Sequence, residues 1–188
     1  IVSTFAGLEL VETKFVLKLR KGFLLQNLGF LNYFDKFPKN EKENCLFKSK
    51  IIIPNCFTLN SKKLSYGLFC PSDLVLFGLT EDLKILFSCG EVPVKERTWE
   101  GKAHCRYNAE QHIIINAARK KGMKILCEAH DDYSAKGQEQ WEKFLVSNYV
   151  MVSYSDFGVK VTQKDLIDPI RMEDCYTPAD WLDMYNNL

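Results

Sequence analysis

Residues 71–132 decide the fold, and they read PSDLVLFGLTEDLKILFSCGEVPVKERTWEGKAHCRYNAEQHIIINAARKKGMKILCEAHDD. The apolar run LVLF at 74–77 predicts a buried strand. The polar TED at 80–82 predicts a turn, and residues 84–89 form a second apolar run. Two short apolar runs joined by a polar turn predict a β-hairpin.

The second half of the same stretch predicts a helix followed by a strand. Asn108 is a favourable N-cap residue, and Gln111 stands where its side chain can bond back to the cap. Gly122 supplies the left-handed backbone that ends many helices. Residues 123–129 are apolar again and predict a third strand.

The residues before the stretch add strands and a loop. Alternation over 14–20 predicts a half-buried strand, and the isoleucines at 51–53 predict a short strand that Pro54 stops. Residues 23–34 are rich in Phe and Leu and fit a helix or a strand. Residues 35–44 are charged and contain a proline, which indicates a loop insertion.

The residues after the stretch add two helices and a hairpin. Ser134 and Thr177 each precede a helical pattern as a predicted cap. Residues 149–162 alternate around Asp-Phe-Gly at 156–158, which predicts a hairpin. The sequence thus predicts a single domain, residues 1–188, of mixed α/β (α+β) class. We expect a central mixed β-sheet with hairpins, flanked by about three helices.

Composition restricts the class of protein. Apolar residues make up 46% of the 188 residues, and no apolar run reaches the roughly 18–20 residues of a membrane helix. The seven cysteines are odd in number and contain no CxxC pair, which favours a reducing, intracellular compartment, cytoplasm or nucleus. Residues 1–66 hold 11 Lys and Arg against 5 Asp and Glu, whereas residues 123–188 hold 6 against 12.

Four residues of the stretch resemble the site of the PD-(D/E)xK nuclease superfamily. Asp73 begins a predicted strand, Glu91 and Lys95 follow the next one, and Gln111 lies on the following helix. The resemblance implies that Asp73 and Glu91 hold Mg²⁺ or Mn²⁺, which prefer oxygen ligands. It also implies that Lys95 steadies the attacking water and that Gln111 supports the site.

The function implied by this resemblance is nucleic-acid processing by a metal-dependent nuclease core. The spacing departs from the family pattern, since Ser72 separates the proline from Asp73 and Pro93 stands between Glu91 and Lys95. A nuclease-like but catalytically degenerate core therefore stays open.

A second function class is a non-enzymatic protein-interaction or scaffold domain, with a structural zinc as an option. Cys127 and His130 have metal-ligand spacing, and Cys105 and His112 could complete a tetrahedral zinc site. The competing interpretation makes the cysteines core residues and the histidines surface or capping groups.

Two partner surfaces are predicted. The basic first third could contact the phosphates of nucleic acid. The acidic C-terminal helix carries Trp181, Met184 and Tyr185 on one face, which would bind a protein partner if exposed and would otherwise pack on its own domain. No contact with a membrane is expected.

Overall fold

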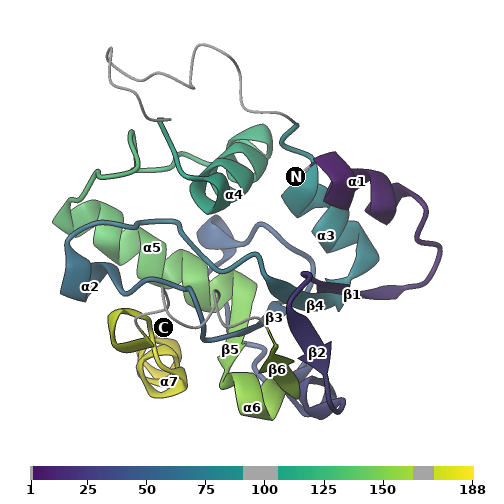
Figure 1. The fold of residues 1–188 in the computed structure, drawn as a ribbon. Helices are drawn as coiled ribbons and strands as arrows, with labels where there is room; N and C mark the ends of the chain where they lie inside the picture. Colours follow the sequence, from purple (N-terminus) through teal and green to yellow (C-terminus); the bar gives the residue numbers. More distant parts are fainter. Residues whose placement is uncertain (1, 91–105, 163–171) are drawn as a thin grey trace.

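The computed structural model describes residues 2–90, 106–162 and 172–188, and Figure 1 shows their arrangement. The strands are β1 (Phe15–Leu19), β2 (Phe23–Leu25), β3 (Ile51–Pro54), β4 (Val75–Leu79), β5 (Tyr149–Val152) and β6 (Val159–Val161). The α-helices are α1 (Val2–Glu9), α2 (Ser61–Leu64), α3 (Thr80–Phe87), α4 (Ala109–Lys120), α5 (Ala135–Asn148), α6 (Tyr154–Phe157) and α7 (Pro178–Asn186). The 3₁₀ turns are η1 (Gly29–Tyr33), η2 (Lys42–Asn44) and η5 (Met172–Asp174).

The main sheet has four strands in the order β1-β4-β3-β5. β4 runs antiparallel to both β1 and β3, whereas β3 runs parallel to β5. β3 and β4 are buried along their whole length, as central strands covered on both faces must be. The prediction of a mixed sheet flanked by helices is confirmed.

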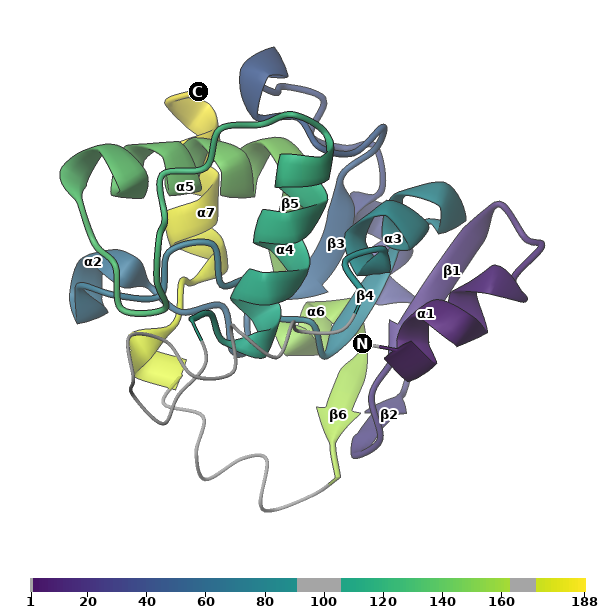
Figure 2. The ribbon, with the colours of Figure 1, turned by 90° about the horizontal axis from the view of Figure 1, so that it is seen from above.

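Each face of the sheet has its own cover. α3 contacts β1 and packs against α1 and α4, which lie together on one side (Figures 1 and 2). The other face is covered by η1 and α6, because the Phe30 ring lies 4.6 Å from that of Phe77 and 4.9 Å from that of Phe157. β2 and β6 pair in a separate two-stranded ribbon below the sheet (Figure 1).

The predicted hairpin at 74–89 is wrong in its second half, because residues 80–87 form helix α3. Leu83 and Leu86 lie three residues apart and are 0% and 3% exposed, so the apolar run covers the sheet as a helix. Asp82 lies in the first turn, and its two carboxylate oxygens accept the backbone N–H groups of residues 48 and 49 at 2.9 and 3.0 Å. The partners of β4 are thus the distant strands β1 and β3.

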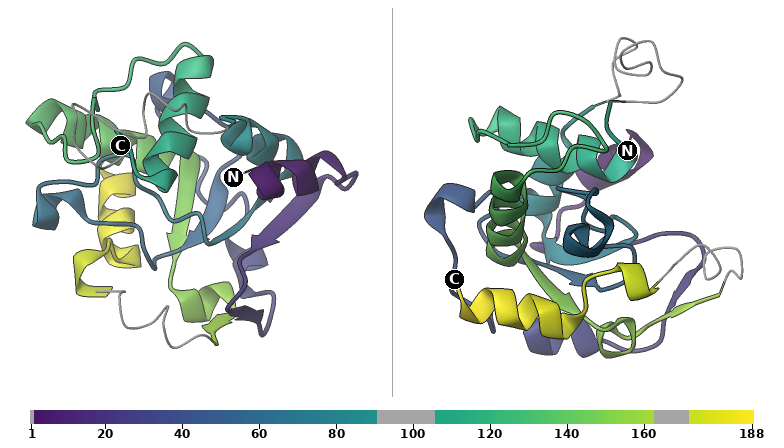
Figure 3. Two further views of the ribbon diagram at one scale, coloured as in Figure 1. Left: turned by 45° about the horizontal axis from the view of Figure 1, so that its top comes forward. Right: turned by 90° about the vertical axis from the view of Figure 1, so that its left-hand side faces the viewer.

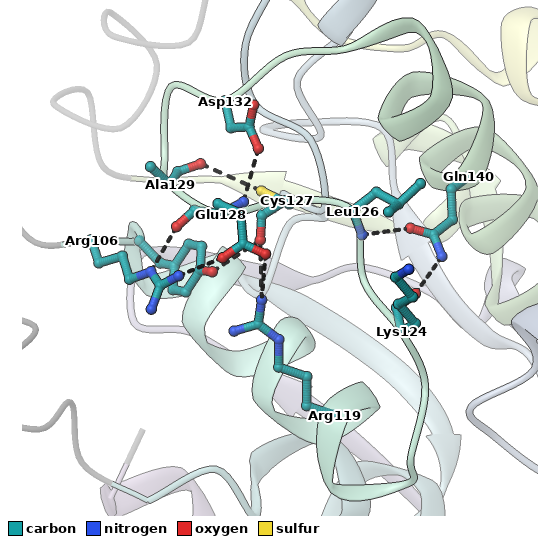
Figure 4. A network of polar contacts seen from close by, with 10 residues as sticks. Arg106, Arg119, Lys124, Leu126, Cys127, Glu128, Ala129, Asp132 and Gln140 are labelled. Atoms are coloured by element: carbon teal, nitrogen blue, oxygen red, sulfur yellow. Dashed lines mark hydrogen bonds and ion pairs between the residues drawn. The ribbon is translucent and has the colours of Figure 1, made fainter.

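The strand predicted at 123–129 is also wrong, since these residues pair with no strand among residues 2–90, 106–162 and 172–188. Side chains take the place of a neighbouring strand, as Figure 4 shows. Gln140 on α5 accepts the N–H of Leu126 at 2.8 Å and donates to the carbonyl of Lys124 at 2.6 Å. Asp132 accepts the N–H of Glu128 at 2.9 Å. The segment can approach α5 closely because Gly137 has no Cβ. A Cβ at this position would lie 2.8 Å from the Leu126 carbonyl oxygen.

Gln140→Ala should therefore loosen this segment. It removes the partner of the Leu126 N–H and of the Lys124 carbonyl, and because water can reach these groups we expect a loss of about 0.5–1.5 kcal/mol of stability. The expected result is a lower urea midpoint and faster hydrogen exchange of the Leu126 amide. Gln140→Glu keeps the acceptor and loses the donor, so its effect should be smaller. Equal exchange in all three proteins would contradict the assignment.

The hairpin predicted at 149–162 is wrong as well. β5 pairs with β3, and β6 pairs with β2, so the two segments belong to different sheets. α6 lies between them and ends at Gly158, whose φ of 89° requires a residue without a Cβ. A Cβ there would also lie 2.6 Å from the Asn27 carbonyl oxygen. The turn was recognisable from the sequence, whereas the partner strands were not.

The predicted helix starts are confirmed. Asn108 and Thr177 each form a capping box, with Gln111 and Asp180 as the reciprocal partners. The Ser134 side chain accepts the N–H of Gly137 at the start of α5. Pro178 occupies the first turn of α7, where its missing N–H is tolerated.

The aromatic stripe on α7 packs inside its own domain. Trp181 and Tyr185 are 1% and 6% exposed, and both rings stand edge-on to Phe37 at 4.9 and 5.2 Å. α7 itself lies against α5 and β5 (Figure 3). These two side chains therefore do not form the exposed anchors that a partner would need, and a protein partner on this helix stays a prediction.

In the described ranges, no helix combines the length and apolar character that a bilayer crossing requires. The described cysteines are free thiols: Cys45, Cys56, Cys70, Cys89, Cys127 and Cys175. An intracellular location in the cytoplasm or nucleus stays a prediction.

Candidate functional site

An ion pair joins β1 to the residue that leads into β4. Lys18 lies opposite Leu76 in the ladder, on the side of the sheet that faces α3. Its Nζ is 3.5 Å from Asp73 Oδ2 and also donates to the Asp73 main-chain oxygen. The two side chains are only 14% and 23% exposed. Burial lowers the pKa of Lys18, and the Asp73 carboxylate acts against that shift.

The first turn of α4 brings a second carboxylate within electrostatic reach of this ion pair. Gln111 Nε2 donates to the Leu68 carbonyl at 2.8 Å and fixes the start of α4 beside residues 68–73. Glu110 lies in that first turn. Burial raises the pKa of Glu110, the negative charge of Asp73 raises it further, and Arg20 and Lys18 oppose the shift.

Arg20 completes the group. It follows β1, and its backbone N–H donates to the Leu74 carbonyl at 3.0 Å, which places it next to Asp73. Its side chain is exposed, unlike the other three. We call Lys18, Arg20, Asp73 and Glu110 the Asp73 cluster. It combines two carboxylates with two cations from three separate parts of the chain.

Cys70 lies beside the Asp73 cluster as a neutral thiol. Asn108 Nδ2 contacts its sulfur at 3.3 Å, while Asn108 Oδ1 accepts the N–H of Gln111 at 2.8 Å. Burial raises the pKa of Cys70 to about 12, and the charges of Glu110 and Asp73 add to the shift. A thiol with this pKa is protonated at neutral pH, so Cys70 is not a thiolate nucleophile.

The loop that carries Cys70 and Asp73 starts from a strained residue. Phe69 has a φ of 55°, a left-handed conformation that costs a bulky residue about 1–3 kcal/mol. Its ring is 0% exposed and lies 5.3 Å from the Trp141 ring and 5.5 Å from the Phe144 ring. Core packing on α5 therefore holds this loop in place, which is typical of functional loops.

The Asp73 cluster has the parts needed for proton transfer beside an anionic ligand. A carboxylate whose pKa is raised toward neutrality is a better general base than one at its ordinary value. Ammonium and guanidinium groups next to it stabilise negative charge on phosphate oxygens. Lys18 and Asp73 keep 14% and 23% of their side-chain surface exposed and Arg20 is exposed, so the cluster borders solvent.

The predicted nuclease residues are not brought together by the described part of the structure. Asp73 belongs to the Asp73 cluster, but Glu91 and Lys95 lie outside the described residues. Gln111 is 0% exposed and is occupied by the helix cap, the Leu68 carbonyl and the His130 carbonyl at 3.3 Å. Its role in these contacts is structural.

The described residues among the predicted zinc ligands each contact a different partner. His112 bonds to Asn116 within α4, at 3.0 Å between ring Nδ1 and the side-chain nitrogen. The Cys127 sulfur contacts the Ala129 carbonyl at 3.4 Å, and His130 Nδ1 lies 3.8 Å from Asp131. Cys105 lies outside the described residues. In residues 2–90, 106–162 and 172–188, no three His, Cys, Asp or Glu side chains are grouped to hold a metal ion. Binding of zinc, Mg²⁺ or Mn²⁺ stays a prediction.

Lys18 and Glu110 were missed as site residues in the sequence. The alternation over 14–20 predicts only a half-buried strand for Lys18, although a lysine between apolar neighbours on a partly covered strand is a signal for a buried partner. Glu110 lies in the first turn of a predicted helix. An acid is common there because it interacts favourably with the helix dipole, so its presence does not indicate a site.

A separate groove of about 450 Å³ lies between α5, α7 and the loop before η2. Its two lysines are paired with acids of the same groove: Lys62 and Glu142 are 2.7 Å apart, and Lys143 lies 3.3 Å from Glu41. The lining holds two lysines against the four acids Glu41, Glu139, Glu142 and Asp183, so the groove is acidic and disfavours an anionic ligand. The Asp73 cluster, which combines two cations with a carboxylate of shifted pKa, is the stronger candidate for an anionic ligand.

Comparison with known proteins identifies a family. A family model described as WavE lipopolysaccharide synthesis matches residues 1–188. No curated protein and no solved structure matches the chain. The match overturns the resemblance to PD-(D/E)xK nucleases and the predicted nucleic-acid-processing function, with its nuclease, nucleic-acid-binding and hydrolase attributes. The acids and lysine that suggested a nuclease have a spacing that ordinary strand ends also produce.

Proposed function

The chain belongs to the WavE lipopolysaccharide synthesis family, and from this premise we propose that it transfers a sugar residue during lipopolysaccharide assembly. The donor would be a sugar activated by a phosphate leaving group, and the acceptor would be a hydroxyl of the growing saccharide. The single observation that carries this proposal is the family match over the whole chain. The Asp73 cluster supports it because its residue types suit that reaction.

The proposed step uses Glu110 as the general base. Its carboxylate takes the proton of the acceptor hydroxyl while the acceptor oxygen forms the new bond to the sugar carbon. The bond between that carbon and the phosphate oxygen breaks, and the phosphate leaves with the bonding electron pair. Lys18 and Arg20 stabilise the negative charge that develops on the leaving phosphate.

Glu110 suits the role of base better than Asp73. Asp73 is paired with Lys18 at 3.5 Å, so its carboxylate is already engaged with a cation. Burial and the neighbouring Asp73 carboxylate raise the pKa of Glu110, so it holds a proton more readily. Asp73 then acts as a positioning residue that keeps Lys18 in the cluster.

The test is sugar transfer by the purified protein. Labelled UDP-glucose, UDP-galactose and GDP-mannose are each incubated with core-truncated lipopolysaccharide, and label in the lipopolysaccharide is counted. We expect transfer from one donor and a drop of about 10²-fold in Asp73→Asn, because Lys18 is then misplaced. Asp131→Asn, which changes an acid that is 61% exposed, is the matched control and should be fully active. Transfer unaffected by Asp73→Asn, or no transfer from any sugar nucleotide, would refute the proposal.

A further inference from the structure

Large apolar side chains are exposed along one segment near the N-terminus. They are Phe15 (37% exposed), Leu19 (39%), Leu24 (52%), Leu28 (56%) and Leu31 (47%). A few isolated apolar residues on a surface need no explanation. Five within 17 residues of one another are a concentration that indicates an interaction surface.

The elements that carry these side chains are packed together. The Phe15 ring on β1 stands edge-on to the Phe34 ring beside η1 at 5.1 Å. η1 contacts α6, and β2 pairs with β6. The backbone N–H of Gln26 donates to the Gly158 carbonyl at 2.7 Å, which ties the end of β2 to the turn after α6. We call Phe15, Leu19, Leu24, Leu28 and Leu31 the leucine surface.

Basic side chains surround the leucine surface. Lys160 lies directly opposite Leu24 in the β2–β6 ladder, and both side chains point outward. Lys14 lies over the Phe15 ring at 5.2 Å, and Lys36 lies over the Tyr33 ring at 5.2 Å. Lys21 is exposed in the turn between β1 and β2.

The acids near this surface are fewer. Asp35 lies beside Lys36, and its carboxylate accepts a hydrogen bond from the Ser49 hydroxyl at 3.1 Å. Asp156 is exposed on α6. Exposed leucines within a predominantly basic rim match the chemistry of an anionic lipid bilayer, where apolar chains lie beneath phosphate headgroups.

In contrast to the expectation from the sequence that the protein makes no membrane contact, we propose that the leucine surface docks on an anionic membrane. Its leucines enter the boundary between headgroups and acyl chains, and its lysines contact lipid phosphates. Lys18 and Leu19 are neighbours on β1, so strand alternation directs them to opposite faces. The docked protein therefore holds the Asp73 cluster close to the bilayer but away from its interior. This inference goes beyond the proposed function, because docking needs no sugar donor.

Vesicle sedimentation tests the docking. The purified protein is mixed with vesicles of phosphatidylcholine alone or with 30% phosphatidylglycerol, with no sugar nucleotide present. We expect the anionic vesicles to bind the protein about tenfold more tightly than the neutral ones. The triple variant L24Q/L28Q/L31Q should lose about tenfold or more of that binding.

The matched control changes three exposed residues elsewhere, Y66Q/Y133Q/L182Q, whose side chains are 44%, 41% and 43% exposed. It should bind as the unaltered protein does, and circular dichroism should show all three proteins folded. Equal binding to neutral and anionic vesicles, or undiminished binding of the leucine triple variant, would overturn the proposal. So would a change in oligomeric state caused by the leucine triple variant, since the surface would then join copies of this chain. None of these outcomes depends on sugar transfer.

Discussion

Glu110→Gln is expected to lower sugar transfer by about 10²- to 10⁴-fold, the usual contribution of a general base. Gln has nearly the same shape as Glu but cannot accept the proton of the acceptor hydroxyl. The first turn of α4 should keep its form, because the cap depends on Asn108 and Gln111. The measurement is the rate of label transfer from the active sugar nucleotide at saturating donor. Glu81→Gln, at an exposed acid paired with Lys48 at 3.0 Å, is the control and should keep full activity.

The same substitution should stabilise the folded protein at neutral pH, in contrast to its effect on activity. Burial raises the pKa of Glu110 in the folded state above its ordinary value. The folded state then binds a proton more tightly than the unfolded state, so the contribution to stability is complete below the unfolded pKa. It is lost as the pH rises through the folded pKa.

Gln carries no charge at any pH, so it avoids this loss. The urea midpoints of the wild type and Glu110→Gln should therefore be close at about pH 4, and the variant should exceed the wild type increasingly toward pH 7. Loss of activity together with gain of stability would mark Glu110 as a functional residue. A variant that is fully active, or one less stable than the wild type at pH 7, would refute this role.

Local chemistry explains which parts of the fold could be predicted. The starts of α4, α5 and α7 were readable because a cap depends on residues within one turn of one another. Residues 80–87 were misassigned because a short apolar run fits a strand or a helix. In the structure, Asp82 stabilises the helix start by accepting the backbone N–H groups of residues 48 and 49, which are more than thirty positions away in the sequence.

The candidate site depends on the same distant contacts. Asp73 was identified from its place before a strand, but its neighbours come from β1 and from α4. Pairing of Lys18 with Asp73 follows from the register of β1 against β4, which one sequence does not reveal. The family assignment likewise needed comparison with a family model, because two acids and a lysine at strand ends occur in many unrelated folds.

Asn148→Ala is expected to cost about 3–5 kcal/mol of stability, the largest structural effect we predict. Asn148 is 0% exposed and uses both ends of its amide. Its oxygen accepts the N–H groups of Leu46 at 2.6 Å and Phe47 at 3.3 Å. Its nitrogen donates to the carbonyls of Asn44 at 2.6 Å and Phe144 at 2.9 Å. Alanine leaves buried backbone groups of the loop before β3 unpaired.

Urea unfolding with circular dichroism measures this loss, and two further variants separate its causes. Asn148→Asp keeps the acceptor for the loop N–H groups, and its protonated form offers one O–H donor in place of the two amide hydrogens. It should therefore retain part of the stability at low pH, where the acid is neutral, and lose more at neutral pH, where the charged acid has no donor. Asn187→Ala removes an exposed amide that bonds only within α7, to the Asp183 carbonyl at 2.9 Å, and should change stability by less than about 0.5 kcal/mol. A small effect of Asn148→Ala would mean that water replaces the lost bonds. The loop would then be held by the Phe47 ring, which stands edge-on to Tyr149 at 5.8 Å, rather than by this amide.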